Sequence, residues 1–553
     1  MESQQGLPGK GATYPKQHRR NYPRSKDGCL PCRAKRKKCD KAKPYCNACV
    51  RSTQACVWPG DDTKESQSDS NSSPTAPTSE QTDIRAIKSE GKRPTVSESD
   101  QALTDLNFAM VSLSTSSDTQ IFRRFLFDWT TPADASEVYS LSWFAHLPNI
   151  YAKASVDSLV HRSFKALANA SYGQRFNSSE ALTNANKWYG KAIQMLKAQV
   201  LSIKDSSSYC DVMTAIVLLG IYEGLIMESM ALEGSWVSHT SGGAALLSIR
   251  GQDKIMKSPE EFEVSAVSFQ QMIYSSFLTG VAPSVSWSSV NELGLPDVPY
   301  FYEHTEHMYQ AACLFAEWRT ALLNHESDDD LKHLFNIANR ALALDKRYEE
   351  WAHSLPSSSA YTPKSLSVES QPEWLQPLLN GPWKPLNTHT YPSLMIQVLW
   401  RFYWMVRAIM NQALLFTNGI FGQRQVKANP IFPHRANIES NILSFTDLLC
   451  ESCLSTLVNV TKRVPNHMGA EAVPSLWGYL ILHVLPTIGL CLEQVVLPDI
   501  DLSGRREWAA KLRHFLRVNL GIAKGATAIP PSHVGKIPIQ TWGLPHKLPD
   551  SAK

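Results

Sequence analysis

Residues 29–56 read CLPCRAKRKKCDKAKPYCNACVRSTQAC and contain six of the 11 cysteines in the chain. The cysteines follow the spacing C-x2-C-x6-C-x6-C-x2-C-x6-C, in which one half-motif occurs nearly twice. The first 30 residues contain no apolar run that could act as a secretory signal, so we expect an intracellular, reducing environment. In that environment a short cysteine framework is typical of a metal site rather than of disulfides.

The number of cysteines indicates how the metal is bound. Zinc prefers four tetrahedral thiolate ligands, so two separate ions would need eight ligand positions, whereas six cysteines are present. A single ion would leave two thiols over, but two Zn²⁺ ions that share two bridging thiolates use all six. A segment this short has almost no hydrophobic core, so metal binding should supply most of its folding free energy. The expected zinc ligands are Cys29, Cys32, Cys39, Cys46, Cys49 and Cys56.

A run of cations lies between the second and third cysteines. Residues 33–38, RAKRKK, contain five Lys or Arg and are compatible with a short helix. Five like charges at this density repel one another unless an anion such as a phosphate is close, so a merely solvated face is the weaker interpretation. Lys and Arg also carry the donors that recognise guanine O6 and N7 in the major groove. The run therefore predicts binding to double-stranded DNA.

The six-cysteine segment resembles the DNA-binding domain of the fungal binuclear zinc cluster transcription factors. The resemblance rests on the cysteine spacing, on the basic run after Cys32, on Pro44 and on the string CNACVR from Cys46 to Arg51. It covers a small part of the chain, but its motif is specific. It implies a structural role for every cysteine of the segment and a set of residues that contact DNA.

These roles are implied by the resemblance alone. The bridging ligands would be Cys29 and Cys46, with Cys32 and Cys39 completing the shell of one ion and Cys49 and Cys56 that of the other. Base readout of a CGG-type triplet would come from Lys35 and Arg36, and phosphate contacts from Arg33, Lys38 and Lys41. Phosphate contacts set affinity and salt dependence, whereas base contacts set sequence preference.

The positive charge of the chain is confined to this end. Residues 1–60 carry 14 Lys/Arg against 3 Asp/Glu, whereas 61–553 carry 41 against 48, so a net charge of +4 conceals two different regions. Residues 1–28 are basic without an apolar pattern, which predicts a disordered arm that follows the DNA backbone. Together with the 33–38 run, this arm fits a split nuclear import signal, so we expect the protein in the nucleus.

Residues 57–102 are predicted to form a disordered linker after the cluster at 29–56. The stretch 61–100 contains 14 Ser/Thr, 9 Asp/Glu and no aromatic residue, so it cannot bury a core. Many members of the zinc cluster family carry a dimerising heptad coiled coil at this point, but no heptad pattern occurs here. Binding as a monomer and homodimerisation through the large domain therefore both remain open.

Residues 103–553 are predicted to form one large all-α domain. Apolar residues recur at helical spacing, as in 156–167 and 188–200, and Pro- and Ser-rich clusters such as 354–363 interrupt them. We expect about 15 to 20 helices from average helix and loop lengths. The most apolar stretch, 476–492, falls just short of a bilayer span and contains His and Pro, which predicts a buried helical hairpin and no membrane association.

Motifs in this domain favour regulation over catalysis. The string Tyr222-Glu223, Trp236-x-x-His239-x-x-Gly242 and Leu246-Leu247-x-x-Arg250-Gly251 is similar to the helical regulatory domain that follows the cluster in the same fungal family. A lone His on an apolar helix face is usually a hydrogen-bonded core residue, and Cys450 and Cys453 in a helical pattern are expected to be buried small apolar groups. We find no nucleophile elbow, P-loop, dinucleotide fingerprint or H-E-x-x-H motif, so nothing favours an enzyme.

The sequence therefore predicts a nuclear, sequence-specific regulator of RNA polymerase II genes. Its cluster would read CGG-type triplets, and its helical domain would receive a signal or recruit the transcription machinery or co-regulators. One alternative is a zinc-stabilised protein-interaction adaptor without base readout, which the five cations at 33–38 argue against. A second alternative is an enzyme or small-molecule sensor in the helical domain, which no motif supports.

Overall fold

The computed structural model describes two separate parts of the chain. Near the N-terminus it describes residues 29, 32, 33, 39–41, 46 and 49. In the large domain it describes residues 117–130, 142–203, 206–226, 235–250, 258–288, 299–426, 432–461, 469–494 and 500–522. Its contacts divide the chain into the units Met1–Thr95 and Val96–Lys553. The predicted arm, linker, Cys56, Lys35, Arg36 and Lys38 lie outside the described residues.

The large unit is built mainly of helices, as predicted. The α-helices are α4 (Ser117–Trp129), α5 (Ser142–Lys153), α6 (Leu159–Phe176), α7 (Ser179–Val200), α8 (Ser206–Ile226), α9 (Ser235–Arg250), α10 (Pro259–Thr279), α12 (Pro299–Leu323), α13 (Asp328–Ser354), α14 (Gln376–Leu379), α15 (Leu394–Gln423), α16 (Arg435–Thr461), α17 (Ser475–Leu482), α18 (Leu485–Gln494) and α19 (Ser503–Asn519). The described residues also contain the short 3-10 helices η1 (Ser357–Ser359), η2 (Glu373–Leu375) and η3 (Ala470–Ala472).

Helix ends follow from capping residues that the sequence provides. Ser158 caps α6 by accepting from the N–H of His161, and Asn177 ends it in the left-handed conformation, with φ 55°. Ser178 then caps α7 directly, so α6 and α7 form a tightly connected pair. Because α6 begins after Ser158, the apolar residue Val156 precedes the helix and is exposed, although the helical pattern of 156–167 included it.

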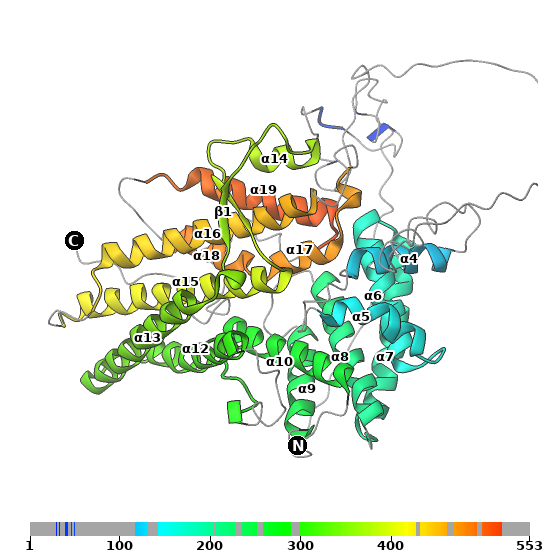
Figure 1. The fold of residues 1–553 in the computed structure, drawn as a ribbon, viewed down its shortest axis with the longest axis horizontal. Helices are drawn as coiled ribbons and strands as arrows, with labels where there is room; N and C mark the ends of the chain where they lie inside the picture. Colours follow the sequence, from blue (N-terminus) through cyan, green and yellow to red (C-terminus); the bar gives the residue numbers. More distant parts are fainter. Residues whose placement is uncertain are drawn as a thin grey trace, which may run out of the picture. The chain divides into compact units, whose positions relative to one another are not determined.

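The helices of the large unit form two groups joined by α10. Figure 1 shows α4 to α9 together at one end, and α12, α13, α15, α16, α18 and α19 together at the other. α10 packs on α8 and α9 on one side and on α12 on the other. Near the C-terminus the chain returns to the first group, where α17 packs on α4 and α19 on α6.

The most apolar helices are core helices. The segment Ser208–Ile226 of α8 is long and apolar enough to cross a membrane, but 78% of its apolar window is buried inside the helical domain. The expected hairpin at 476–492 is buried, but it is not a hairpin. Here α17 and α18 form one helical path that bends by 46°. Pro486 provides no N–H for the helical ladder, and Nη1 of Arg401 donates to the carbonyl of Leu480 beside the break, at 3.0 Å.

A β pair lies among the helices of the domain that the sequence predicted to be all-α. β1 (Thr362–Ser365) pairs antiparallel with β2 (Asn387–Thr390), with Thr362 opposite Thr390. β2 is held on α16, since the N–H of His389 donates to Oγ of Ser455 and its Nε2 lies 2.9 Å from Oε2 of Glu451. The pair is a small addition to a helical domain.

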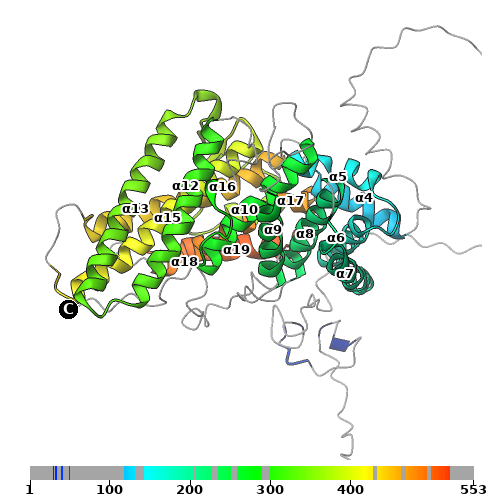
Figure 2. The same cartoon turned by 90° about the horizontal axis from the view of Figure 1, so that it is seen from below.

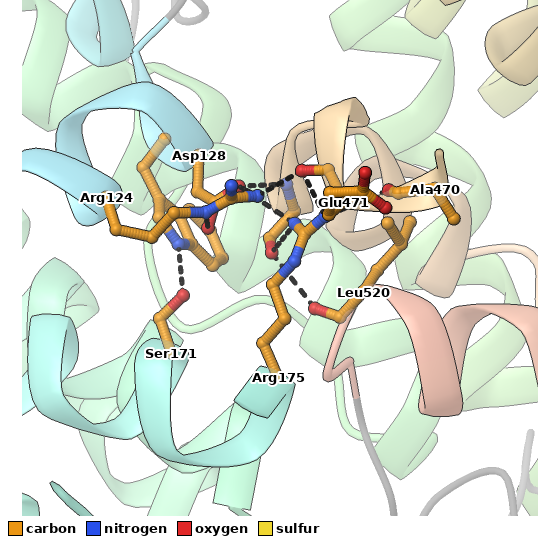
Figure 3. Close-up of polar contacts among 9 residues, drawn as sticks. Arg124, Asp128, Ser171, Arg175, Ala470, Glu471 and Leu520 are labelled. Atoms are coloured by element: carbon orange, nitrogen blue, oxygen red, sulfur yellow. Dashed lines mark hydrogen bonds and ion pairs between the residues drawn. The ribbon is translucent and has the colours of Figure 1, made fainter. Parts of the chain in front are cut away.

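A buried ion pair links α4 to α6. Nη1 of Arg175 donates to Oδ1 of Asp128 at 2.8 Å, and the two side chains are only 2% and 1% exposed. Arg124, one turn earlier on α4, also donates to Asp128, through Nε at 2.8 Å and Nη2 at 2.9 Å. Figure 3 shows the two guanidinium groups converging on this carboxylate. Burial lowers the pKa of Arg175 to about 10, although the charge of Asp128 opposes that shift.

The same cluster reaches the C-terminal segment (Figure 3). Nη2 of Arg175 donates to the carbonyls of Ala470 and Glu471, both at 3.0 Å. Ser475, at the start of α17, accepts from Arg175 and donates through Oγ to the carbonyl of Leu520 at 2.9 Å. The polar cluster therefore joins both ends of the helical domain.

Candidate metal centre and DNA-contacting residues

Five cysteine sulfurs meet in one buried group near the N-terminus. Cys29, Cys32, Cys39, Cys46 and Cys49 are all buried. The Sγ atoms of Cys29, Cys32, Cys39 and Cys46 all lie within 4.8 Å of one another. The shorter Sγ–Sγ distances are 3.6 Å for Cys29–Cys46, 3.5 Å for Cys29–Cys49, 3.6 Å for Cys32–Cys46 and 3.8 Å for Cys39–Cys29.

These distances fit zinc. A Zn–S bond of about 2.3 Å in a tetrahedron separates its sulfur ligands by about 3.8 Å. The measured spacings lie close to that value, and the donors are the thiolates that zinc prefers. No hydrophobic cluster accompanies them among the described residues of this unit, in keeping with a fold that depends on metal binding.

A backbone hydrogen bond lies next to the cysteines in each half of the motif. Cys32 and Arg33 are helical, and the N–H of Arg33 donates to the carbonyl of Cys29 at 3.1 Å. In the second half the N–H of Cys49 donates to the carbonyl of Cys46 at 3.0 Å and also to its Sγ at 3.4 Å. The two cysteines of each C-x2-C pair belong to the same buried group.

The groups around Cys46, one of the two expected bridging ligands, favour its thiolate form. Burial raises the pKa of the Cys46 thiol, but the N–H of Cys49 and the neighbouring sulfurs lower it, and the result is a pKa of about 6. Burial raises the pKa of Cys29 and Cys32. A bound zinc ion deprotonates its thiol ligands outright, so it would supply the counter-charge that the raised pKa values call for.

The distances leave the division of sulfurs between two ions open. The Cys29–Cys46 edge would be shared, and Cys29 also lies near Cys39 and Cys49, as a bridging ligand should. However, Cys32 and Cys49, which the family resemblance assigns to different ions, are also only 3.9 Å apart. The sixth expected ligand, Cys56, lies outside the described residues.

Two of the five expected DNA-contacting residues are described. Arg33 and Lys41 are both exposed, and Arg33 is helical together with Cys32. Lys41 has a left-handed backbone with φ 62°, which turns the chain between the third and fourth cysteines. The two expected base readers and Lys38 lie outside the part that the structure describes.

His239, Cys450 and Cys453, which the sequence predicted to be core residues, are buried. His239 is hydrogen-bonded to the hydroxyl of Tyr189 through Nε2 at 3.1 Å, and burial lowers its pKa to about 4. Cys450 and Cys453 are buried on α16. The polar cluster around Asp128 gave no signal in the sequence.

Comparisons with known proteins place the chain in a family. Residues 27–65 match the fungal Zn(2)-Cys(6) binuclear cluster domain, and residues 119–370 match the fungal specific transcription factor domain. Transcription factor lfc1 of Flammulina velutipes is 51% identical over 41 residues, which are 7% of this chain and 15% of that protein. The uncharacterized transcriptional regulatory protein C965.10 of Schizosaccharomyces pombe is 48% identical over 44 residues, 8% of each chain. No solved structure matches.

The chain therefore belongs to the Zn(2)-Cys(6) fungal transcription factors, with a binuclear cluster domain followed by a fungal-specific transcription factor domain. The cluster domain implies two zinc ions bound by the clustered cysteines. Cluster domains of this type bind DNA, and the class acts in the nucleus. The class is one of transcription factors and not of enzymes. The chain matches only 15% and 8% of the length of these two curated relatives.

Proposed function

We propose that this protein regulates RNA polymerase II transcription in the nucleus by reading CGG-type triplets through its zinc cluster. The observation that carries the proposal is the group of five buried sulfurs at tetrahedral spacing, from which a helical turn leads directly into the basic run 33–38. A helix held by a rigid metal centre can enter the major groove.

In this proposal each cysteine of 29–56 is a zinc ligand, including Cys56, and the ions supply a compact, charge-balanced centre for a chain without a core. Cys29 and Cys46 bridge the ions. Lys35 and Arg36 donate to guanine O6 and N7, while Arg33, Lys38 and Lys41 bind phosphates and set the position of the helix on the duplex.

We further propose a division of labour along the chain. Residues 1–28 form a basic arm that assists import and follows the DNA backbone, 57–102 form a linker, and 103–553 form the domain that receives a signal or recruits co-regulators. Homodimerisation, where it occurs, uses the large domain, because the sequence after the cluster contains no heptad repeat.

Selection of bound sequences from a randomised duplex library tests the proposal. The zinc-loaded full chain should enrich CGG triplets, singly for a monomer or as two triplets at fixed spacing for a dimer. Uniform, salt-sensitive binding without enrichment would contradict base readout and favour the adaptor alternative.

A further inference from the structure

Helix α7 presents a long face to solvent at one end of the large domain (Figures 1 and 2). Its neighbours are mainly α6 and α8. Only four of its 22 residues are buried, and three of these are alanines: Ala181, Ala185, Ala192 and Leu196. At a rise of about 1.5 Å per residue the helix is about 33 Å long, so it offers an extended outer surface.

The surface formed by α6 and α7 is positively charged, although the domain as a whole carries a small net negative charge. Residues 159–200 contain six Lys/Arg and one Asp/Glu, whereas residues 103–553 contain 36 and 39. Arg175 is paired with Asp128, but the structure shows no ion pair between a described residue and Arg162, Lys165, Lys187 or Lys191. We define these four residues as the α6–α7 basic face.

The cations of this face are held close to one another. Nζ of Lys165 and Nζ of Lys191 each lie 4.5 Å from the ring centroid of Trp188, so the two ammonium groups are within about 9 Å of each other. Lys187 lies one turn before Lys191 on α7. Nε of Arg162, one turn before Lys165, is buried and has no hydrogen-bond acceptor in the described part of the chain.

The positive potential extends into the neighbouring core. Burial lowers the pKa of His161, and the charges of Lys165 and Arg162 lower it further, against the opposing charge of Asp157. Four cations in this arrangement repel one another, and a polyanion laid along the face would relieve that repulsion.

We propose that the α6–α7 basic face binds the phosphate backbone of the DNA that flanks the site held by the zinc cluster. A B-form duplex carries one negative charge per about 1.7 Å, and the length of α7 is close to one helical turn of about 34 Å. The inference rests on DNA binding by the cluster, but not on which bases the cluster reads.

Tethering favours DNA over a free anionic partner. A protein bound through its cluster already has flanking duplex nearby, so even weak contacts of the second module act at high effective concentration. The 60 residues between Cys56 and Ser117 could span at most about 200 Å if extended, so chain length allows both modules to meet one duplex. An acidic protein segment is the competing occupant.

The test compares full-chain variants on two duplexes that share one selected site. The short duplex is about 14 base pairs and holds only the cluster, and the long one is about 40 base pairs. The test variant is Lys187→Gln with Lys191→Gln. The control is Lys332→Gln with Lys346→Gln, which removes the same charge from exposed lysines of α13, with side chains 77% and 76% exposed.

For the wild type and the control, lengthening the duplex should raise affinity about tenfold and steepen the salt dependence. In the test variant most of this gain in affinity should be lost. The slope of log affinity against log salt concentration on the long duplex should fall by about two units, because each lost phosphate contact removes about 0.9. An equal gain in both variants, or no gain in the wild type, would overturn the inference. Absence of wild-type binding to either duplex would contradict the proposed function as well.

Discussion

Ser475 donates its backbone N–H to Oδ1 of Asp128 at 3.3 Å, although 347 residues separate them in the sequence. The carboxylate is buried and also accepts from two arginines. A buried acid with these partners holds the first helix of the large domain against a segment near its end. Its removal should therefore affect the whole domain rather than one helix.

Asp128→Asn should lower the free energy of unfolding of the large domain by about 3 to 5 kcal/mol, because the buried guanidinium of Arg175 would lose its counter-charge. Chemical denaturation followed by helical circular dichroism measures the loss. Lys346→Gln is the control, because it breaks an exposed pair with Glu350 and should cost less than about 1 kcal/mol. Similar losses in both variants would show that Asp128 is not a central contact.

Gly521→Ala should lower the free energy of unfolding by about 1 to 3 kcal/mol, because residue 521 lies against α6 where the C-terminal segment packs on it. Gly521 has φ 67°, and a Cβ atom there would lie 2.6 Å from the backbone nitrogen of Arg175. Gly190→Ala on α7 is the matched comparison, since nothing lies within 4 Å of its Cβ position, and it should stabilise by about 0.5 to 1 kcal/mol. Thermal melts of the two variants should shift in opposite directions.

The large domain should lose stability in acid because it buries neutral histidines. Burial lowers the pKa of His304 to about 3 and those of His239 and His483 to about 4. An unfolded His has a pKa near 6.5, so the unfolded chain binds more protons between that pH and the lowered values. Stability should therefore fall as the pH drops from about 6.5 toward 4, by up to about 1.4 kcal/mol per pH unit for each histidine.

His304→Phe tests the pH dependence. The substitution removes a titrating group and also the 2.7 Å hydrogen bond between Nδ1 and the Tyr348 hydroxyl, so stability should fall near neutral pH, and this deficit should shrink as the pH drops. The informative quantity is the slope of the unfolding free energy between pH 6 and 4, which should decrease by about 1.4 kcal/mol per pH unit. A slope equal to that of the wild type would show that His304 does not contribute to the loss of stability in acid.

Cys46→Ser should unfold the zinc cluster, because the proposal makes Cys46 a bridging ligand of both ions. The variant should bind fewer than two zinc ions per chain, by mass spectrometry of the intact protein, and should lose sequence preference on DNA. Cys210→Ser, which changes a half-buried cysteine of α8, should retain both ions. Retention of two ions by Cys46→Ser would contradict the ligand assignment.

Base and phosphate contacts should differ in their response to substitution. Lys35→Ala or Arg36→Ala should cost about 1 to 3 kcal/mol at the preferred triplet and relax preference there, with zinc content unchanged. Lys41→Asn removes a charge but tolerates the left-handed backbone, and should weaken all sequences alike while reducing the salt slope by about one unit. Loss of preference in Lys41→Asn would contradict its role as a phosphate contact.

The cysteine motif could be predicted from the sequence because its information is local. Six thiols within 28 residues limit the metal and its geometry, and the structure brings the five described sulfurs together accordingly. The helical class of the large domain was also predictable from periodicity. The exact starts of helices were not predictable, as Val156 shows, because the cap at Ser158 starts α6 at Leu159 rather than at the first apolar residue of the pattern.

Long-range polar contacts could not be predicted in the same way. Nothing near Asp128 in the sequence indicates Ser475 or Leu520 as neighbours, since only tertiary packing brings them together. The bend between α17 and α18 was missed as well, because an apolar run with one proline fits a hairpin as well as a bent helix. Lys187 and Lys191 fit the solvent face of any amphipathic helix, so only the structure shows that no described acidic residue is paired with them.

The junction at Asp128 also bears on how the protein is made. When α4 leaves the ribosome, Ser475 lies 347 residues downstream, and synthesis at about 5 to 20 residues per second needs roughly 20 to 70 s to reach it. During that interval the Asp128 carboxylate has both of its arginine partners but lacks the N–H of Ser475, and the face of α4 that packs on α17 stays uncovered. The cysteine motif needs only its own residues and zinc, so the two modules should mature at different times, and the larger one should depend on chaperones while translation continues.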